Sequence, residues 1–162
     1  MTTAYISLGS NVEPEANIPK ALELLAAQVR LQGLSTFYRT EPVGPEGQPD
    51  FINGVAQVRT DLPPRALKFD VLRPIEAALG RQRGPDRYAP RPIDLDLLVC
   101  GDFAMDEPDL VLPDPALNER PFLAAALADL DPVLAPAVDG TPGEPLLDFS
   151  RRLKERFLTH EP

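Results

Sequence analysis

The chain has 162 residues, enough for one domain with a substantial core, and its 43% hydrophobic and 25% charged residues are typical of soluble globular proteins. Its formal net charge of −9 argues against non-specific binding to nucleic acid or to anionic membranes. The start lacks the basic and apolar segments of a signal peptide, and no apolar run approaches the roughly 20 residues that span a bilayer. We therefore expect one cytoplasmic domain over residues 1–162, with the single cysteine, Cys100, as a core residue.

The first part of the chain predicts three strands and one helix. The strands are expected over residues 4–8, 34–40 and 51–60. Apolar residues at helical spacing predict a helix over 15–32, with Gly33 as its C-terminal cap. Residues 41–50 hold three prolines and two glycines, and they form either a surface connection or a loop that closes over a ligand.

The second part predicts a helix over 64–79, in which Pro74 removes a backbone hydrogen bond and should cause a kink. The elements expected after this helix are a strand over 93–99, a short strand over 109–112, and helices over 119–130 and 145–158. The resulting order, β-α-β-β-α-β with C-terminal additions, predicts an α+β fold of the ferredoxin-like type. In this fold we expect an antiparallel sheet with helices packed on one face.

Residues 80–99 contain the most informative pattern in the sequence. Four arginines lie in the first half of this stretch, where glycine and proline interrupt regular structure and the prolines stiffen the chain: Arg81, Arg83, Arg87 and Arg91. In the second half Asp94 and Asp96 alternate with aliphatic residues. In a strand both carboxylates therefore share one face, and the aliphatic side chains enter a core.

The paired aspartates have two interpretations. Two carboxylates on one strand face repel each other unless a hard cation lies between them, and oxygen ligands suit Mg²⁺. Neighbouring guanidinium groups then bind phosphate oxygens through paired donors, as in phosphoryl transfer. Alternatively, both side chains are merely solvated on an edge strand, because the D-x-D spacing is common. The adjacent arginines and the aliphatic face of the strand favour a metal and phosphate site.

A second candidate site residue is Asn53, which shares a strand face with Phe51. An amide beside an aromatic ring offers hydrogen bonds and a stacking surface to a flat heterocycle. Asn53 could equally be a satisfied polar residue near the start of a strand. The residues alone leave these alternatives open.

Three segments of the chain carry a resemblance to a known family. They read Y-I-S-L-G-S-N near the start, F-Y-R-T-E-P-V-G-P-E-G-Q-P-D-F-I-N-G-V in the middle, and A-P-R-P-I-D-L-D-L-L after G-R-Q-R. In this order they resemble the 6-hydroxymethyl-7,8-dihydropterin pyrophosphokinases of folate biosynthesis. The resemblance covers nearly the whole chain, and the segment around D-L-D-L is its most specific signature.

The resemblance implies an ATP-dependent enzyme and its partners. Members of the family transfer the β,γ-pyrophosphoryl group of MgATP to the hydroxymethyl oxygen of a reduced pterin and release AMP. The family has a ferredoxin-like fold and holds two magnesium ions with its D-x-D pair. ATP and the pterin are thus the expected partners, and neither nucleic acid nor a membrane is expected.

The same resemblance implies a role for individual positions. The expected metal ligands are Asp94 and Asp96, and the expected catalytic residues are these two with Arg81 and Arg91. The residues expected around ATP are Arg81, Arg83, Tyr88, Arg91 and Arg120. The residues expected around the pterin are Thr40, Val43, Phe51, Asn53 and Phe122, of which the two phenylalanines sandwich the ring.

Two positions depart from the family pattern. Asp114 stands where the family usually has a histidine, and Gly84 stands where a lysine is often found. Both changes remove a possible phosphate contact. A free carboxylate beside a triphosphate is repelled, so we expect Asp114 to be turned away, neutralised by Arg120, or recruited to a magnesium. Alternatively, Asp114 is only a turn residue between two prolines.

Two functions from other classes compete with the pyrophosphokinase hypothesis. The changes at Asp114 and Gly84 suggest a pterin- or nucleotide-binding paralogue without transfer activity. The element order also suits an RNA-binding module, but the acidic charge and the lack of an aromatic R-G-F-x-F-type strand motif argue against one.

Overall fold

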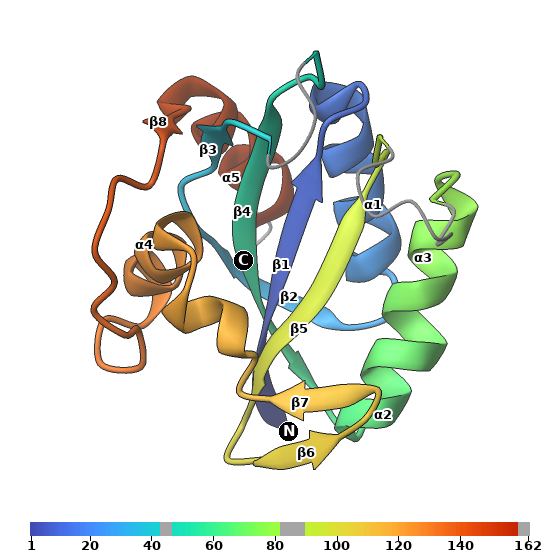
Figure 1. Cartoon of the computed structure of the whole chain (residues 1–162). Helices are drawn as coiled ribbons and strands as arrows, with labels where there is room; N and C mark the ends of the chain where they lie inside the picture. Colours follow the sequence, from blue (N-terminus) through green and yellow to red (C-terminus); the bar gives the residue numbers. More distant parts are fainter. Residues whose placement is uncertain (43–46, 82–89, 159–162) are drawn as a thin grey trace.

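The computed structural model describes residues 1–42, 47–81 and 90–158. Within these ranges one antiparallel sheet has the strand order β5-β1-β4-β3-β8, and β2 also pairs with β4 (Figure 1). The strands of this sheet are β1 (Thr2–Ser10), β2 (Arg30–Leu34), β3 (Tyr38–Thr40), β4 (Phe51–Thr60), β5 (Asp94–Cys100) and β8 (Glu144–Pro145). The helical elements are α1 (Pro14–Ala26), α2 (Pro64–Ala66), η1 (Leu67–Leu72), α3 (Arg73–Ala78), η2 (Pro115–Asn118), α4 (Pro121–Leu130) and α5 (Leu147–Leu158).

The fold is the α+β, ferredoxin-like arrangement predicted from the order of the elements. β1 lies in the middle of the sheet, between β4 and β5, and is antiparallel to both. α1 follows β1, and the second helical stretch, α2 to α3, follows β4. The strand that carries the two aspartates, β5, is therefore an edge strand beside the central one.

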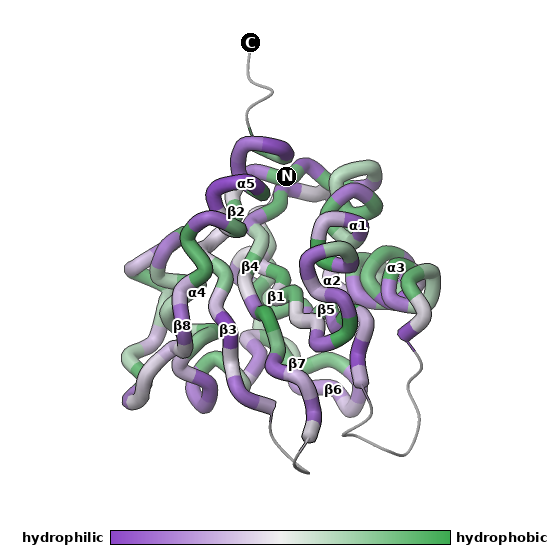
Figure 2. Tube along the Cα trace, turned by 90° about the horizontal axis from the view of Figure 1, so that it is seen from above, coloured by the Kyte–Doolittle hydropathy of each residue, from purple (hydrophilic) through white to green (hydrophobic). Residues whose placement is uncertain are grey.

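Alternate residues of the central strands enter two different cores. Ile6 and Leu8 of β1 belong to the larger core, which includes buried residues of α1, η1, α3 and α5. Tyr5 belongs to a second core with Val55 of β4 and Leu127 of α4. α4 thus lies on the opposite face of the sheet from α1 and α3 (Figure 2). Our expectation that all helices cover one face is wrong for α4.

The first helix is shorter than its apolar spacing predicts. α1 ends at Ala26, and Gly33 lies within β2 instead of capping a helix. Val29 continues the helical spacing and is buried, but it lies in the turn that leads into β2. The predicted helical boundary was wrong because one buried turn residue fell in register with the helix.

The predicted strand over 34–40 is divided into β2 and β3. Ser35 lies between them, and its backbone N–H donates to the carbonyl of Val55 at 2.9 Å. The Val55 N–H in turn donates to the Ser35 hydroxyl at 2.9 Å. Two residues on, the Phe37 N–H donates to the hydroxyl of Ser150 on α5 at 2.8 Å. Serine hydroxyls thus replace ladder hydrogen bonds where the chain leaves the sheet.

The helix predicted over 64–79 is present, but its middle is not α-helical. η1 is a π-helical segment, and the Arg73 N–H donates to the carbonyl of Lys68 five residues earlier. In a regular α-helix the ring of Pro74 clashes with the carbonyl of Asp70. The wider π-helical turn changes the position of this carbonyl before the proline is reached.

The short strand predicted over 109–112 corresponds to β7 (Leu110–Leu112). It pairs with β6 (Met105–Glu107), which the sequence did not predict, in a hairpin separate from the main sheet. The two C-terminal helices are confirmed as α4 and α5. None of the helices in the described ranges has the length and apolar character needed to cross a membrane.

Candidate active site

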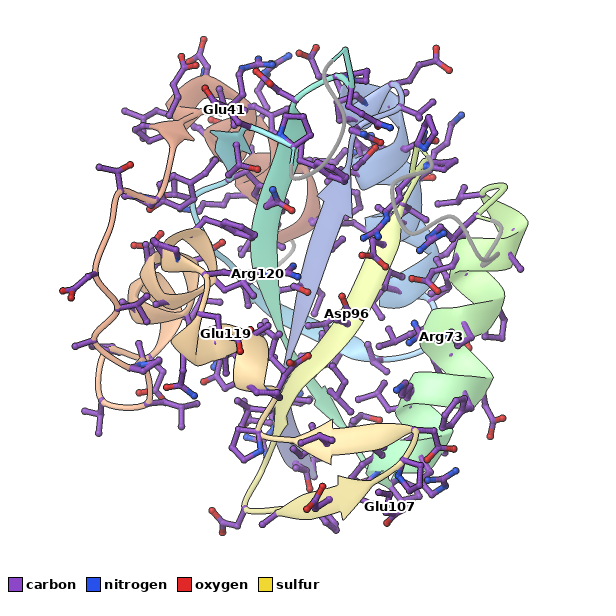
Figure 3. The ribbon with its side chains drawn as sticks, viewed as in Figure 1. Glu41, Arg73, Asp96, Glu107, Glu119 and Arg120 are labelled. Carbon is purple, nitrogen blue, oxygen red and sulfur yellow. The ribbon has the colours of Figure 1, made fainter. Side chains whose placement is uncertain are left out.

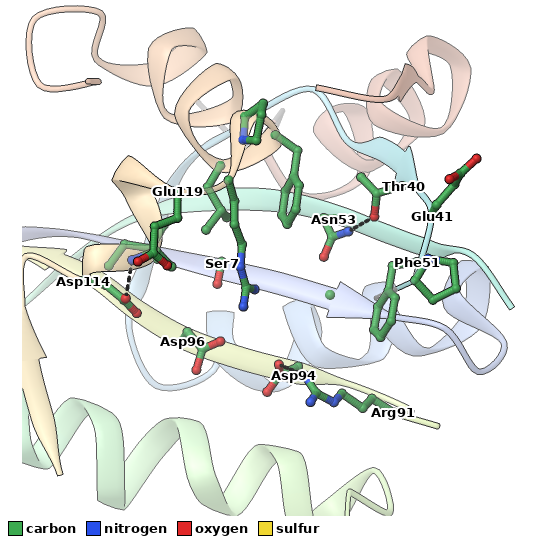
Figure 4. Close-up of a pocket in the computed structure, with 18 of the residues that line it drawn as sticks. Ser7, Thr40, Glu41, Phe51, Asn53, Arg91, Asp94, Asp96, Asp114 and Glu119 are labelled. Atoms are coloured by element: carbon green, nitrogen blue, oxygen red, sulfur yellow. Dashed lines mark hydrogen bonds and ion pairs between the residues drawn. The ribbon is translucent and has the colours of Figure 1, made fainter. Parts of the chain in front are cut away.

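A cavity of about 500 Å³ opens over the sheet face that α4 partly covers (Figure 4). Its floor is formed by residues of β1, β4 and β5, and its walls come from the chain after β3 and from the segment between η2 and α4. The predicted site residues that line it are Thr40, Phe51, Asn53, Arg91, Asp94, Asp96, Arg120 and Phe122. The structure therefore brings together residues predicted for both substrates and for the metal.

The register of three strands places the two halves of the site side by side. Gly9 on β1 pairs with Asn53 on β4 and with Asp94 on β5. A Cβ atom on Gly9 would lie 2.6 Å from Oδ1 of Asn53, so the glycine leaves the space that this amide occupies. Two residues earlier on β1, Ser7 pairs with Asp96. Gly9 and Ser7 were not predicted, although small residues alternate on this strand.

The Asn53 end of the cavity has a fixed amide between two aromatic positions. Nδ2 of Asn53 donates to the Thr40 hydroxyl at 2.7 Å, and this bond sets the orientation of the side chain (Figure 4). Phe51 at the start of β4 and Phe122 at the start of α4 line the same cavity. Amide and aromatic groups from separate elements thus converge on a volume suited to a flat heterocycle.

At the other end, Asp94 and Asp96 extend from β5 into the cavity. Nη1 of Arg91 donates to Oδ2 of Asp94 at 3.0 Å, and the Asp94 side chain is only 16% exposed. Burial raises the pKa of Asp96 to about 7, and the neighbouring charge of Asp94 adds to this increase. Arg73 opposes the increase, whereas Asp114 and Glu76 add to it. The pair therefore resists full ionisation unless a cation compensates its charge.

The donor set of this end fits magnesium. In the part of the chain that the structure describes, no group of three or more His, Cys, Asp or Glu is arranged to enclose a metal. Magnesium is usually bound by one or two carboxylates together with water and substrate phosphates. Asp94 and Asp96 on one strand face supply such a partial set. Burial, and then the charge of Asp94, raise the pKa of Asp96, and a bound cation would favour its ionised form.

Asp114 lines the cavity beside these two aspartates. Its backbone N–H donates to the carbonyl of Leu98 at 2.8 Å, which fixes it next to β5. Its Oδ1 accepts from the Ala116 N–H at 2.9 Å and so caps η2. The residue thus has the turn role that we considered, but its negative charge also raises the pKa of Asp96. It is not turned away from the cavity, contrary to one of our expectations.

The chain that leads into β5 is held by Asn11, which follows β1. The Asn11 N–H donates to the Arg91 carbonyl at 3.0 Å, and Oδ1 of Asn11 accepts from the Arg91 N–H at 2.7 Å. Nδ2 of Asn11 also lies 3.4 Å from Oε1 of Gln48, another residue of the cavity wall. This buried amide was missed because only the fold brings it to Arg91.

The remaining predicted residues are not all placed in the cavity. Arg120 lines it, together with Glu119, an acidic residue that the sequence did not predict (Figures 3 and 4). Arg81 lies at the end of α3 and does not line the cavity. Three predicted residues lie outside the described residues, and so does Gly84: they are Val43, Arg83 and Tyr88.

A second cavity, of about 310 Å³, adjoins the first. Asp96 and Asp114 line both cavities and therefore lie between them. The other walls of the second cavity combine apolar and charged residues of β5, the β6–β7 hairpin, η1 and η2: Lys68, Leu97, Pro108, Asp109, Leu110, Val111 and Pro115. The two cavities are thus neighbours that share these two carboxylates.

The sequence matches a known protein family over most of its length. The family model for 7,8-dihydro-6-hydroxymethylpterin-pyrophosphokinase (HPPK) matches residues 5–132. The chain is 41% identical to the 2-amino-4-hydroxy-6-hydroxymethyldihydropteridine pyrophosphokinase of Pseudomonas aeruginosa, over 80% of this chain and 81% of the relative. A Porphyromonas gingivalis protein of the same name is 38% identical, over 84% of this chain and 95% of the relative.

Solved structures support the same fold. A crystal structure of HPPK-DHPS in complex with substrates matches with a TM-score of 0.61 at 12% sequence identity. The match covers 97% of this chain and 46% of the other, so this chain spans just under half of that longer protein. At this identity the likeness concerns the fold, whereas the sequence matches concern the family.

Proposed function

The chain belongs to the 7,8-dihydro-6-hydroxymethylpterin-pyrophosphokinase family, and from this premise we propose that its two cavities bind the substrates of pyrophosphoryl transfer on either side of Asp94 and Asp96. As a member of this family the protein is a pyrophosphokinase. In the reaction the hydroxymethyl oxygen of the pterin forms a bond to the β-phosphorus of ATP. The bond from this phosphorus to the oxygen shared with the α-phosphate breaks, AMP leaves, and the proton of the hydroxyl group is released.

One observation carries this assignment. Asn53, Gly9 and Asp94 form a single row across three strands, so a heterocycle held by Asn53 lies beside the aspartates. Phe51 and Phe122 supply aromatic surface to the heterocycle, and Asn53 supplies an oriented amide. A substituent on the ring then points along the row towards the pair of carboxylates. This arrangement supports the pterin roles of the residues near Asn53, including Thr40.

We assign the metal and phosphate roles to the other end. Asp94 and Asp96 would hold magnesium, which, when bound, neutralises phosphate charge and orients the reacting oxygens. Arg91 lies at hydrogen-bonding distance from Asp94 and lines the cavity, so its guanidinium can contact phosphate oxygens beside this pair. Arg120 contributes a second positive charge from the opposite wall. Positioning and charge neutralisation are the main contributions that a protein makes to such transfers.

The second cavity suits the nucleoside part of ATP. Its walls include apolar residues and adjoin Asp96 and Asp114, so a base bound there keeps the phosphate chain near the aspartates. The pterin and the nucleotide then approach the reacting phosphorus from opposite sides. Positioning of this kind converts a bimolecular reaction into an effectively unimolecular one.

We also retain the cytoplasmic location and the single functional domain as proposals. Cys100 is a buried free thiol, as expected for a protein of a reducing compartment. The two cores share the strands of one sheet, which supports a single structural unit.

The test of the proposed function is AMP formation from ATP, measured in four reactions. These contain both the pterin and Mg²⁺, one of the two, or neither, with EDTA where Mg²⁺ is omitted. We expect AMP only when 6-hydroxymethyl-7,8-dihydropterin and Mg²⁺ are both present. AMP formation without the pterin would indicate a hydrolase, and ADP as the product would indicate transfer of a single phosphate.

A further inference from the structure

The free edge of β5 is covered by two side chains at the point where the metal ligands lie. Among the described residues β5 pairs with β1 alone, so residues between its bonded positions direct their backbone groups outwards. Leu95, between the two aspartates, is such a residue. Its N–H donates to Oε2 of Glu76 at 2.7 Å, and its carbonyl accepts from Nη1 of Arg73 at 3.0 Å.

Glu76 and Arg73 are also bonded to each other. Nη1 of Arg73 lies 3.0 Å from Oε1 of Glu76, one helical turn along α3. The Glu76 side chain is only 2% exposed, and that of Arg73 is 23% exposed. The three residues therefore form a closed ring of hydrogen bonds, in which two side chains replace a neighbouring strand.

This ring holds both peptide groups that connect the aspartates. The N–H of Leu95 belongs to the peptide group that follows Asp94, and its carbonyl belongs to the peptide group that precedes Asp96. Peptide groups are planar, so holding both restricts the backbone angles at Leu95 and the directions of the flanking Cα–Cβ bonds. The spacing of the two carboxylates therefore depends on Glu76 and Arg73.

The energetics also argue for a role beyond stability. A buried ion pair is often no more stabilising than apolar residues of similar size, because two charges must be desolvated. Here the pair is bonded to the backbone of Leu95, between two further carboxylates. An apolar pair would cover the helix but would leave the Leu95 N–H and carbonyl without these partners.

We propose that Glu76 and Arg73 are positioning residues, which fix the separation of the Asp94 and Asp96 carboxylates so that the pair is preorganised for magnesium. The inference rests on the proposed function, since it takes these aspartates as the metal ligands. Groups behind metal ligands commonly change metal affinity by about 10–100-fold when they are mutated. Glu76 and Arg73 hold the backbone of Leu95 between the two aspartates, so we expect their mutation to change metal affinity in the same way.

The test compares Glu76→Gln with Glu155→Gln. Both glutamates pair with an arginine of their own helix, but Glu155 lies on the exposed side of α5, away from the cavities. Mn²⁺ binding is measured by electron paramagnetic resonance in the presence of a non-hydrolysable ATP analogue, and pterin binding is measured separately. We expect Glu76→Gln to weaken Mn²⁺ binding about 10-fold or more. Pterin affinity, and both affinities of Glu155→Gln, should stay at the wild-type values.

Two further measurements separate positioning from general stability. Hydrogen exchange of the Leu95 amide should accelerate in Glu76→Gln, and turnover should recover partly at high Mg²⁺ concentration. If Glu76→Gln does not fold, Arg73→Lys retains the charge but loses the planar group, and it should show a smaller loss of Mn²⁺ affinity. If hydrogen exchange of the Leu95 amide is faster in a folded variant but Mn²⁺ affinity equals that of the wild type, the positioning role is wrong and the proposed function is unaffected. Absence of Mn²⁺ binding by the wild-type protein would overturn the proposed metal role as well.

Discussion

The two faces of the central sheet use the same strands for different purposes. On β1, Ile6 and Leu8 are fully buried in the larger core, whereas Ser7 and Gly9 line the cavity. On β5, Leu95 enters the same core, and its neighbours Asp94 and Asp96 line the cavity. A one-residue shift of either strand would exchange these sets. The apolar face therefore fixes the register on which the geometry of the site depends.

The faces also differ in how their residues can be changed. A core residue contributes through the volume that it fills, and its loss leaves a cavity in the fold. A residue of the site face contributes through an atom in a defined place, and its loss affects the reaction more than stability. Substitutions on the two faces should therefore have separable effects on turnover and on stability.

The largest effect is expected at the metal pair. Asp96→Ala should lower turnover at least about 10²-fold, because a positioned catalytic metal contributes several kcal/mol. The fold should persist, since the apolar face of β5 is unchanged. Steady-state AMP formation and circular dichroism measure the two properties, with the exposed Asp106→Ala as the control. Turnover close to that of the wild type would show that Asp96 is not a metal ligand.

The opposite result is expected for Ile6, a core residue next to Ser7, which pairs with Asp96. Ile6→Ala should lower the free energy of unfolding by about 2–5 kcal/mol, the usual range for removing a fully buried aliphatic side chain. Turnover per folded molecule should stay within a factor of about two of the wild type. Urea denaturation measures the first quantity, and active-site titration corrects the second. A large loss of turnover in fully folded protein would mean that the faces are not independent.

A smaller effect is expected at the aromatic wall. Phe122→Ala should weaken pterin binding by about 1–3 kcal/mol, in line with stacking of a base on an aromatic ring. ATP affinity, measured by calorimetry without the pterin, should change little. A selective loss of ATP affinity would instead place Phe122 in the nucleotide site.

The smallest effect concerns pH and stability. The pKa of Asp96 is raised to about 7 in the folded protein, chiefly by burial, so the folded state holds this proton more tightly than the unfolded state. Ionisation of Asp96 therefore lowers stability as the pH rises from about 4 towards 7, and the full loss is present above pH 7. In the absence of metal, Asp96→Asn should thus be more stable than the wild type at pH 8.

The gain from Asp96→Asn should be at least on the order of 2–4 °C in Tm, the shift that about 1 kcal/mol produces in a chain of this size, and it should disappear near pH 4. Thermal unfolding in EDTA at both pH values measures it. Asp106→Asn, at an exposed position, is the control and should show no such gain. An equal change at both pH values would show that charge is not the cause.

The sequence predicted those parts of the site that depend on residues close together along the chain. Alternation in the D-x-D segment was enough to place Asp94 and Asp96 on one face, and the structure places both in the cavity. Asn53 and Phe51 followed from the same rule on β4. The resemblance supplied the roles of these residues, which alternation alone left open.

The parts that it missed depend on contacts between distant segments. The approach of Asn53 to Gly9 depends on the register of β1 and β4. The contact of Glu76 with Leu95 depends on where α3 lies along the edge of β5. The division of the predicted strand at Ser35 depends on hydroxyl groups that replace ladder bonds. None of these contacts has a signal in local spacing.

The most direct test of the account is the position of the metal. Crystals grown with Mn²⁺, a non-hydrolysable ATP analogue and the pterin would locate it by anomalous scattering. The account predicts manganese peaks about 2–2.5 Å from the carboxylate oxygens of Asp94 and Asp96, between the two cavities. Metal held only by the nucleotide or by Asp114 and Glu119, with Asp94 and Asp96 uncoordinated, would contradict it.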